Sequence, residues 1–257
     1  MKKQINMKKI LFNILLCLGL VALASCEKKV TTEDPSTITY YVTFELNGDA
    51  TMLVPINTPF TDPGVVATEN GVDVNDHVVA TITDPDGDVL NSISTDAPGL
   101  YTIEYSAVNA DGFPASASRT VVVYDPAVTA SIAGTYTTDM NKSKYNANTY
   151  MEWATAKGWG TSASVSFSEI APGFFRCTDL LAGWYCQIRG YGSKYNMTGI
   201  VTLNADNSLT LIQSYVAGWQ DGLDYMQGAV YDPAAGTIDY LVQYAGSLKF
   251  TVSLVQQ

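Results

Sequence analysis

The chain has 257 residues, of which 47% are hydrophobic and 15% charged, and its formal net charge is −11 at pH 7. This length allows two domains, each large enough to bury its own core. The excess of acidic side chains argues against nucleic acid and against an anionic membrane surface as partners, because both attract positive charge.

The N-terminal segment has the pattern of a bacterial lipoprotein signal peptide. Residues 1–25 contain four lysines, followed by an apolar run that is short for a membrane-spanning helix. The run ends in the letters LASC, which resemble the lipobox where such proteins are cleaved and lipidated. Cys26 would be the acylated N-terminus, whether translation starts at Met1 or at Met7. We therefore predict a signal peptide, a lipidated tether at residues 26–36 and attachment to a membrane through lipid.

Charge divides the rest of the chain near residue 126. Without residues 1–25, the chain carries ten basic and 25 acidic side chains, a net charge of −15. Residues 37–125 contain 13 of the acids and a single base, Arg119, whereas residues 127–257 contain nine acids and seven bases. This shift predicts two domains with these boundaries.

The first of these segments is predicted to be a β-sandwich. ITYYVTFEL at residues 38–46 alternates apolar and polar side chains, and YTIEYSA (101–107) and TVVVY (120–124) are further strands. Helical periodicity is absent, and turn-forming residues separate the strands. Short strands at regular spacing are typical of a sandwich.

This segment also resembles a known family. TPFTDPGVVAT (58–68) and residues 97–125 are similar to the bacterial immunoglobulin-like (Ig-like) domains of cell-surface proteins. Gly99, Tyr101 and Ile103 lie where antibody domains carry a Tyr-x-Cys sequence. The resemblance implies an Ig-like sandwich with Ile103 in its core and without an inter-sheet disulfide. It implies no activity, because such domains serve as spacers, adhesins and binding modules alike.

The second segment, residues 127–257, is predicted to be an antiparallel β-barrel or a closed-over sandwich. Its Ile-x-Gly-x-Tyr opening at residues 132–136 weakly resembles lipocalin-like barrels. Residues 141–160 interrupt the strands and are read as a short helix ended by Gly158, or as a long loop. The nine expected strands are GTYTT (134–138), SVSFSEI (164–170), FFRCTDL (174–180), WYCQIRG (184–190), GIVTLN (199–204), SLTLIQS (208–214), GAVYD (228–232), TIDYLVQY (237–244) and LKFTVSL (248–254).

Two cysteines lie close together in this domain. If residues 180–183 form a four-residue hairpin loop, Cys177 faces Cys186 across two strands, within disulfide range. Disulfides persist outside the cytoplasm, and a metal site needs more ligands than two cysteines. We therefore expect a disulfide, and the alternative is two buried free thiols.

The sequence offers little catalytic chemistry. Residues 127–257 contain no histidine, which excludes a serine–histidine triad or a histidine metal site there. Asp221 and Asp224 are a candidate carboxylate pair, but two aspartates in a glycine-containing loop are more often simply solvated. The acidic run at residues 84–88 lacks the glycine and glutamate of an EF-hand loop. We expect no catalytic residue, no metal and no cofactor.

Aromatic residues suggest a binding site instead. All four tryptophans and 11 of the 16 tyrosines lie in residues 127–257. Trp219 lies beside Gln220, Asp221 and Asp224, and Trp159 lies in an irregular segment. Proteins hold sugar rings with an aromatic face bordered by amide and carboxylate groups. These five residues are the candidate ligand-binding site, although a core position is equally compatible with either tryptophan. Trp184 is expected in the core.

DLLAGWY (179–185), YGSKYNMTGIVTLNADNSLTL (191–211) and GAVYDPAAGTIDYLVQYAG (228–246) are similar to the C-terminal domain of two-domain lipoproteins from Bacteroidota. These proteins pair an Ig-like module with a β-rich domain of unassigned function and often accompany outer-membrane glycan-uptake systems. The resemblance implies an outer-membrane lipoprotein, on the cell surface or the periplasmic face, without carrying over any catalytic residue.

We therefore predict a non-catalytic protein that binds a glycan or another extracellular ligand through the second domain. One alternative is a structural, accessory or adhesion module whose partner is another envelope protein. A barrel holding a small apolar ligand is the third hypothesis.

Overall fold

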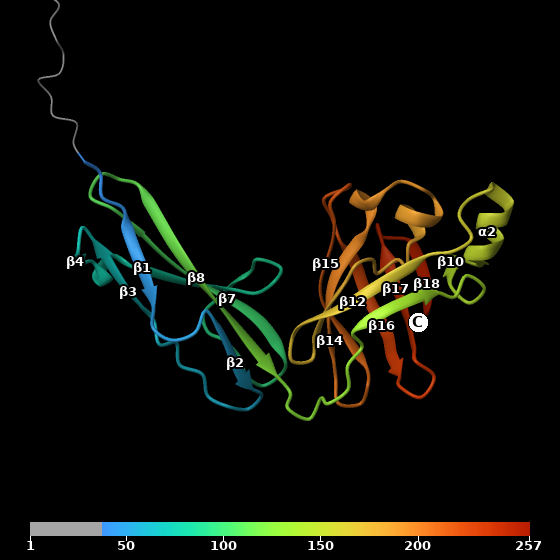
Figure 1. Ribbon diagram of the computed structural model, residues 1–257, viewed down its shortest axis with the longest axis horizontal. Coiled ribbons are helices and arrows are strands. Elements are labelled where there is room, and N and C mark those ends of the chain that lie inside the picture. Colours follow the sequence, from blue (N-terminus) through green and yellow to red (C-terminus); the bar gives the residue numbers. More distant parts are fainter. Residues whose placement is uncertain (1–37) are drawn as a thin grey trace, which may run out of the picture. The chain divides into compact units, whose positions relative to one another are not determined.

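The computed structural model describes residues 38–257, so Cys26, the signal peptide and the tether lie outside the described residues. The strands form three sheets, and the chain is mostly β as predicted (Figure 1). Two sheets use only strands within residues 42–124, and the third uses only strands within residues 134–256.

The first region forms the Ig-like sheets. One sheet has the order β1 (Val42–Leu46), β3 (Val65–Glu69), β4 (Val72–Asp73). The other has the order β2 (Thr51–Pro55), β8 (Pro114–Tyr124), β7 (Gly99–Val108), β5 (Val79–Thr83), β6 (Val89–Leu90). All pairings are antiparallel except that of β2 with β8. A short 3₁₀ turn covers Asn75–His77.

The two sheets bury their facing side chains against each other. Ile103 on β7 is 1% exposed and packs with Val121 and Val123 on β8 and with Val54 on β2. Phe44 on β1 packs against this cluster from the other sheet. Ile103 therefore occupies the core position that the Ig-like resemblance implied.

Arg119, the single base of this region, is fully buried on β8. Its Nη1 donates to Oδ1 of Asp62 (2.6 Å), its Nε to the Asp49 carbonyl (3.1 Å) and its Nη2 to the Asn47 carbonyl (2.7 Å). The Tyr105 hydroxyl donates to the same oxygen of Asp62 (2.6 Å). Burial, and then the Asp62 carboxylate, raises the pKa of Tyr105 well above its usual value. Arg119 thus ties two loops to the β7–β8 hairpin.

The third sheet is a strongly curled antiparallel half-barrel. Its strands follow the order β16 (Leu223–Asp232), β17 (Thr237–Tyr244), β18 (Leu248–Gln256), β9 (Gly134–Thr138), β12 (Ser164–Ala171), β13 (Phe174–Cys177), β14 (Met197–Leu203), β15 (Leu209–Val216). A short strand, β10 (Lys144–Tyr145), pairs with β18 at Phe250 and Thr251, and a second short strand, β11 (Asn148–Thr149), pairs with β10. The outer strands β15 and β16 approach each other at two isolated bridges, Ser208–Val230 and Val216–Asp221.

The interruption after β9 contains the predicted helix, α2 (Tyr150–Lys157), which lies beside β10 (Figure 1). Thr149 caps its N-terminus by accepting a hydrogen bond from the Glu152 N–H, and the Glu152 carboxylate accepts from the Thr149 N–H in return. Gly158 ends the helix in a left-handed conformation. Among residues 38–257, no helix is long and apolar enough to cross a membrane.

Every predicted strand segment of this domain contains a strand except residues 184–190, where the prediction is wrong. Trp184–Ile188 instead form one π-helical turn. Ala182 (φ 53°) and Gly183 (φ 79°) turn the chain into it. A Cβ on Gly183 would lie 2.5 Å from the Cβ of Ala163, so only glycine fits at this close approach.

The chain between β13 and this turn fills the interior of the curled sheet. We call residues 179–186 the interior segment, because all eight are buried. The Asp179 carboxylate organises it by accepting hydrogen bonds from the N–H groups of Leu181 (2.9 Å), Gly183 (3.1 Å) and Met197 (3.2 Å). The Cys186 thiol donates a fourth (3.1 Å). A side chain that bonds its own backbone in this way competes with strand pairing, which explains why β13 ends at Cys177.

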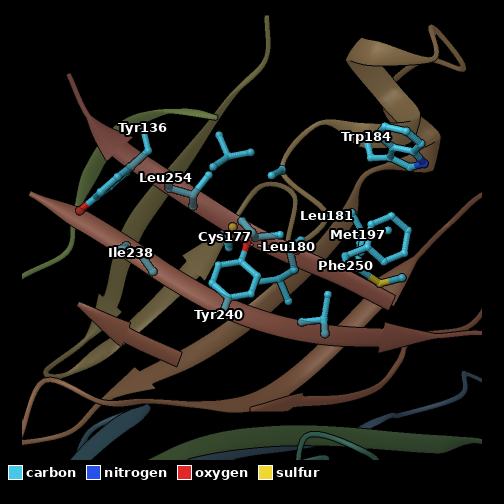
Figure 2. Close-up of a cluster of buried hydrophobic side chains, with 14 of the residues drawn as sticks. Tyr136, Cys177, Leu180, Leu181, Trp184, Met197, Ile238, Tyr240, Phe250 and Leu254 are labelled. Carbon is cyan, nitrogen blue, oxygen red and sulfur yellow. Dashed lines mark hydrogen bonds between the residues drawn. The ribbon is translucent and has the colours of Figure 1, made fainter. Parts of the chain in front are cut away.

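Side chains from the surrounding elements satisfy the carbonyls of the interior segment. The three donors are hydroxyls: Tyr240 to Leu180 (3.0 Å), Tyr150 to Leu181 (3.0 Å) and Thr138 to Ala182 (2.9 Å). Figure 2 shows Leu180 and Leu181 among Tyr240, Met197 and Phe250. The segment is therefore an integral part of the core.

The expected hairpin between the cysteines is absent, and so is the expected disulfide: Cys177 and Cys186 are both free and buried. Cys177 lies on β13, opposite Phe167 and Gly199, whereas Cys186 lies on the π-helical turn beside Asp179. The alternative reading, two buried thiols, is the one that the structure supports.

Replacing Arg119 with lysine removes the forked set of donors while keeping the charge. We expect Arg119→Lys to lower the free energy of unfolding by about 3 kcal/mol, because carbonyls and a carboxylate lose their partner. Urea denaturation measures this, with the exposed neighbour Ser118→Ala as the control. Equal stability of the two variants would contradict the role given to Arg119.

Burial raises the pKa of Cys186 to about 12 and also raises that of Cys177. In a soluble form that begins at residue 27, these are the two remaining cysteines. We expect neither to react with Ellman's reagent in the native state and both to react after unfolding in guanidinium without reductant. If the unfolded protein shows no reactive thiol, the two cysteines are joined in a disulfide and the free-thiol assignment is wrong.

Burial raises the pKa of Asp179 to about 6, against the opposing hydrogen bonds from Cys186 and the backbone. The unfolded value is about 3.9. Between these values the folded protein keeps a proton that the unfolded chain has released, so lowering the pH from 7 to 4 favours folding. Relative to Asp179→Asn, we expect the wild type to gain about 2 kcal/mol over this window in urea denaturation. If the wild type instead loses stability relative to Asp179→Asn as the pH falls, the hydrogen bonds outweigh burial in setting the pKa of Asp179.

Candidate functional site

Trp219 lies in the turn that joins β15 to β16. The Val216 carbonyl accepts hydrogen bonds from the N–H groups of Trp219 (3.2 Å) and Gln220 (2.8 Å), and the Val216 N–H donates to the Asp221 carbonyl (2.8 Å). Gln220 adopts a left-handed conformation (φ 60°). This tight turn leaves Trp219 39% exposed, with the exposed Gln220 and Asp221 next to it.

Three tyrosines support the indole of Trp219. Ring centroids lie 4.7 Å away for Tyr195, 4.8 Å for Tyr185 and 5.9 Å for Tyr244. The preceding residue must be glycine, because a Cβ on Gly218 would come within 2.5 Å of the Tyr195 ring. Trp219 is thus held from inside the domain while part of its surface faces solvent.

Trp159 follows α2 and is half-buried. The backbone N–H of Trp159 donates to the Ala154 carbonyl (2.9 Å), so the turn that ends the helix fixes the position of Trp159. The indole is stacked with that of Trp153 at 6.4 Å and meets Trp184 edge-on at 5.9 Å. Trp184 itself is 1% exposed, which confirms its predicted core position.

Arg189 joins the half-buried Trp159 and the exposed Trp219 into one network. It directly follows the π-helical turn, and its guanidinium carbon lies 4.7 Å from the ring centre of Tyr191, 5.0 Å from Trp159 and 5.3 Å from Tyr185. Tyr185 in turn contacts Trp219. We call Trp159, Tyr185, Arg189, Tyr191, Tyr195, Trp219 and Tyr244 the aromatic network.

The two candidate carboxylates have different surroundings. Asp221 accepts the Tyr244 hydroxyl at 2.9 and 3.1 Å, and burial, followed by this carboxylate, raises the pKa of Tyr244. Asp224 accepts the N–H of Gly246 (2.7 Å) and so fastens the turn between β17 and β18. Asp221 is therefore connected to Trp219 through Tyr244, whereas Asp224 bonds to a different turn.

Of the five predicted site residues, Trp219, Gln220 and Asp221 share one turn, and Trp159 joins them through Arg189 and Tyr185. The prediction missed Tyr185, Arg189, Tyr191, Tyr195 and Tyr244. The sequence did contain a signal for them: Tyr191 and Tyr195 lie in a short loop with glycine and lysine, directly after Arg189.

The arrangement offers aromatic surface, a guanidinium and a bordering carboxylate, which are binding groups. Among residues 38–257, no three His, Cys, Asp or Glu side chains are grouped so as to hold a metal ion. The aspartates at residues 84–88 form a turn in which the Asp84 carboxylate accepts the N–H groups of Asp86 (3.0 Å) and Asp88 (2.9 Å).

Comparisons with known proteins identify both parts of the chain. The family model for a bacterial surface protein Ig-like domain matches residues 44–123, and one described as a C-terminal domain matches residues 125–256. The chain is 36% identical to the lipoprotein BT2262 from Bacteroides thetaiotaomicron, over 84% of this chain and all of that one, with a TM-score of 0.43 for the crystal structure. No curated protein matches.

Neither matched family model describes a catalytic domain. Identity and coverage with BT2262 are high enough to establish common family membership. The chain therefore belongs to the family of this Bacteroides lipoprotein, and it combines a bacterial surface Ig-like domain with the matched C-terminal domain.

Proposed function

We propose that this protein is a non-catalytic cell-envelope lipoprotein that binds a glycan through the aromatic network. The observation that carries the proposal is Trp219, which remains 39% exposed although three tyrosines pack against it. A side chain needed only for the core would be expected to bury its indole more completely. Here the fold holds part of a large apolar ring in water.

The groups around Trp219 suit a sugar. The face of a sugar ring is apolar and stacks on an indole, while its hydroxyls need acceptors and donors at the edge. Gln220 and Asp221 follow Trp219 in the same turn and are exposed, so they can supply these groups, and Tyr191, which is 42% exposed, extends the aromatic surface. Asp221 has acceptor capacity beyond its bond with Tyr244.

The remainder of the chain suits an envelope position. Family membership with a lipoprotein supports lipidation at Cys26 and attachment to the outer membrane, at the cell surface or the periplasmic face. An Ig-like domain of the bacterial surface type supports a role as a spacer between the lipid and the binding domain. Removal of residues 1–25 belongs to the same proposal.

Replacing Trp219 tests the binding site directly. We expect Trp219→Ala to weaken binding of the recognised polysaccharide about tenfold or more, because it removes the stacking surface. Affinity electrophoresis against a polysaccharide panel, followed by calorimetry, measures the loss. Tyr215→Ala is the matched control, since Tyr215 is a similarly exposed aromatic (46%) outside the network.

The rival function is an accessory module that contacts another envelope protein. It predicts that no polysaccharide of the panel binds and that none changes the fluorescence of Trp159 or Trp219. Equal affinities of the Trp219 and Tyr215 variants would also refute the site, even if a polysaccharide binds elsewhere.

A further inference from the structure

Arg189 is a cation without an acidic partner. Its guanidinium lies against three aromatic rings, yet among residues 38–257 no carboxylate comes within 4.0 Å of it, since the salt bridges there belong to His77, Arg119 and Lys142. Its Nε is buried and has no hydrogen-bond partner in the described chain. Buried donors of charged groups nearly always have a partner.

Lys194 is a second unpaired cation on the same loop. It is exposed, lies in a single 3₁₀ turn (Ser193–Tyr195), and its Nζ is 5.1 Å from the ring centre of Tyr195. No carboxylate of residues 38–257 pairs with it either. Lys142, by contrast, faces Asp139 at 3.8 Å.

These two cations border the surface that the sugar would occupy. Tyr191, beneath Arg189, lies 5.5 Å from Tyr195, and Tyr195 lies 4.7 Å from Trp219. Tyr195 thus contacts the exposed indole, while Lys194 is one ring away from it through Tyr195 and Arg189 is one ring away through Tyr185. Asp221, the acid of the site, accepts a hydrogen bond from Tyr244 and forms no salt bridge with either cation.

Unpaired cations are common in this domain, because residues 127–257 contain nine acids and seven bases, and of those bases Lys142 alone forms a salt bridge within the described residues. Arg189 differs from the other bases in its buried, unpartnered Nε and in its position against three aromatic rings. The net negative charge repels an anionic ligand at long range, but salt screens that repulsion beyond about 8 Å at physiological ionic strength. At contact distance the local cations dominate.

We propose that the recognised glycan is anionic, and that Arg189 and Lys194 bind its carboxylate or sulfate groups while Trp219 stacks on a neighbouring sugar. This inference rests on the proposed function and specifies its ligand class. Arginine suits the role because its planar donors match the two oxygens of a carboxylate or sulfate. The rings around it exclude water and strengthen the interaction.

The test uses the intact lipidated protein in non-ionic detergent and matched polysaccharide pairs. Polygalacturonic acid is compared with its carboxyl-reduced form, and chondroitin sulfate with its desulfated form. We expect binding to at least one acidic polymer, about tenfold or more weaker binding to its neutral counterpart, and weaker binding as NaCl rises from 50 to 500 mM. The pair that responds identifies carboxylate or sulfate as the group bound.

Variants assign the effect to the two cations. We expect Lys194→Gln to weaken binding of the acidic polymer about threefold to tenfold and Arg189→Gln to weaken it further, with Lys142→Gln as the unaffected control. Thermal melting verifies that each variant is folded. Because Lys194 is exposed, its variant keeps the test decisive if Arg189→Gln does not fold.

Three outcomes would count against the inference. If a neutral polysaccharide binds as well as its acidic counterpart and depends on Trp219, the ligand class is wrong but glycan binding stands. If an acidic polymer binds without dependence on Lys194 and Arg189, these cations serve only to pack the aromatic rings. If no polysaccharide binds, the proposed function fails as well.

Discussion

The C-terminal domain depends on the hydrogen bonds that the Asp179 carboxylate accepts. This carboxylate holds three backbone N–H groups and a thiol inside the curled sheet, and so fixes the path of residues 179–186 through the core. Loops normally stay at the surface because their backbone groups need partners. Here Asp179 supplies the acceptors, while Tyr240, Tyr150 and Thr138 supply donors for the carbonyls. The Leu and Trp side chains of the segment can then fill the interior.

The same path builds the candidate site. The π-helical turn in which the interior segment ends places Tyr185 against Trp219 and brings Arg189 over Trp159 and Tyr191. Rings continue without interruption from the buried Trp184 through Phe250 and Tyr185 to the exposed Trp219. A ligand at Trp219 would therefore meet a surface held rigid by the core. Such preorganisation reduces the conformational entropy lost on binding.

The strands were predictable because alternation reports which side of a sheet is buried, as in residues 237–244, where the pattern alone indicates the core face. The interior segment was not, since its local sequence suggested a hairpin with residues 180–183 as the loop between two strands. Its conformation is decided by Met197, Tyr150 and Tyr240, which are distant in sequence. For the same reason, local sequence identified Trp219 and its polar neighbours but not Tyr185 or Arg189. Those two reach the site only through the π-helical turn.

The two partly or fully buried arginines show how differently one side chain can serve a fold. Arg119 makes its hydrogen bonds inside the Ig-like region, to Asp62 and to the carbonyls of Asn47 and Asp49, and it is fully buried, so no ligand can reach it. Arg189 is held by rings, which stabilise its charge, and its Nε has no hydrogen-bond partner in the described chain. Cation–π contacts thus position this guanidinium without pairing it with a carboxylate. An arginine kept in this way, one ring away from an exposed indole, is better suited to recognising an acidic ligand than to stabilising the domain.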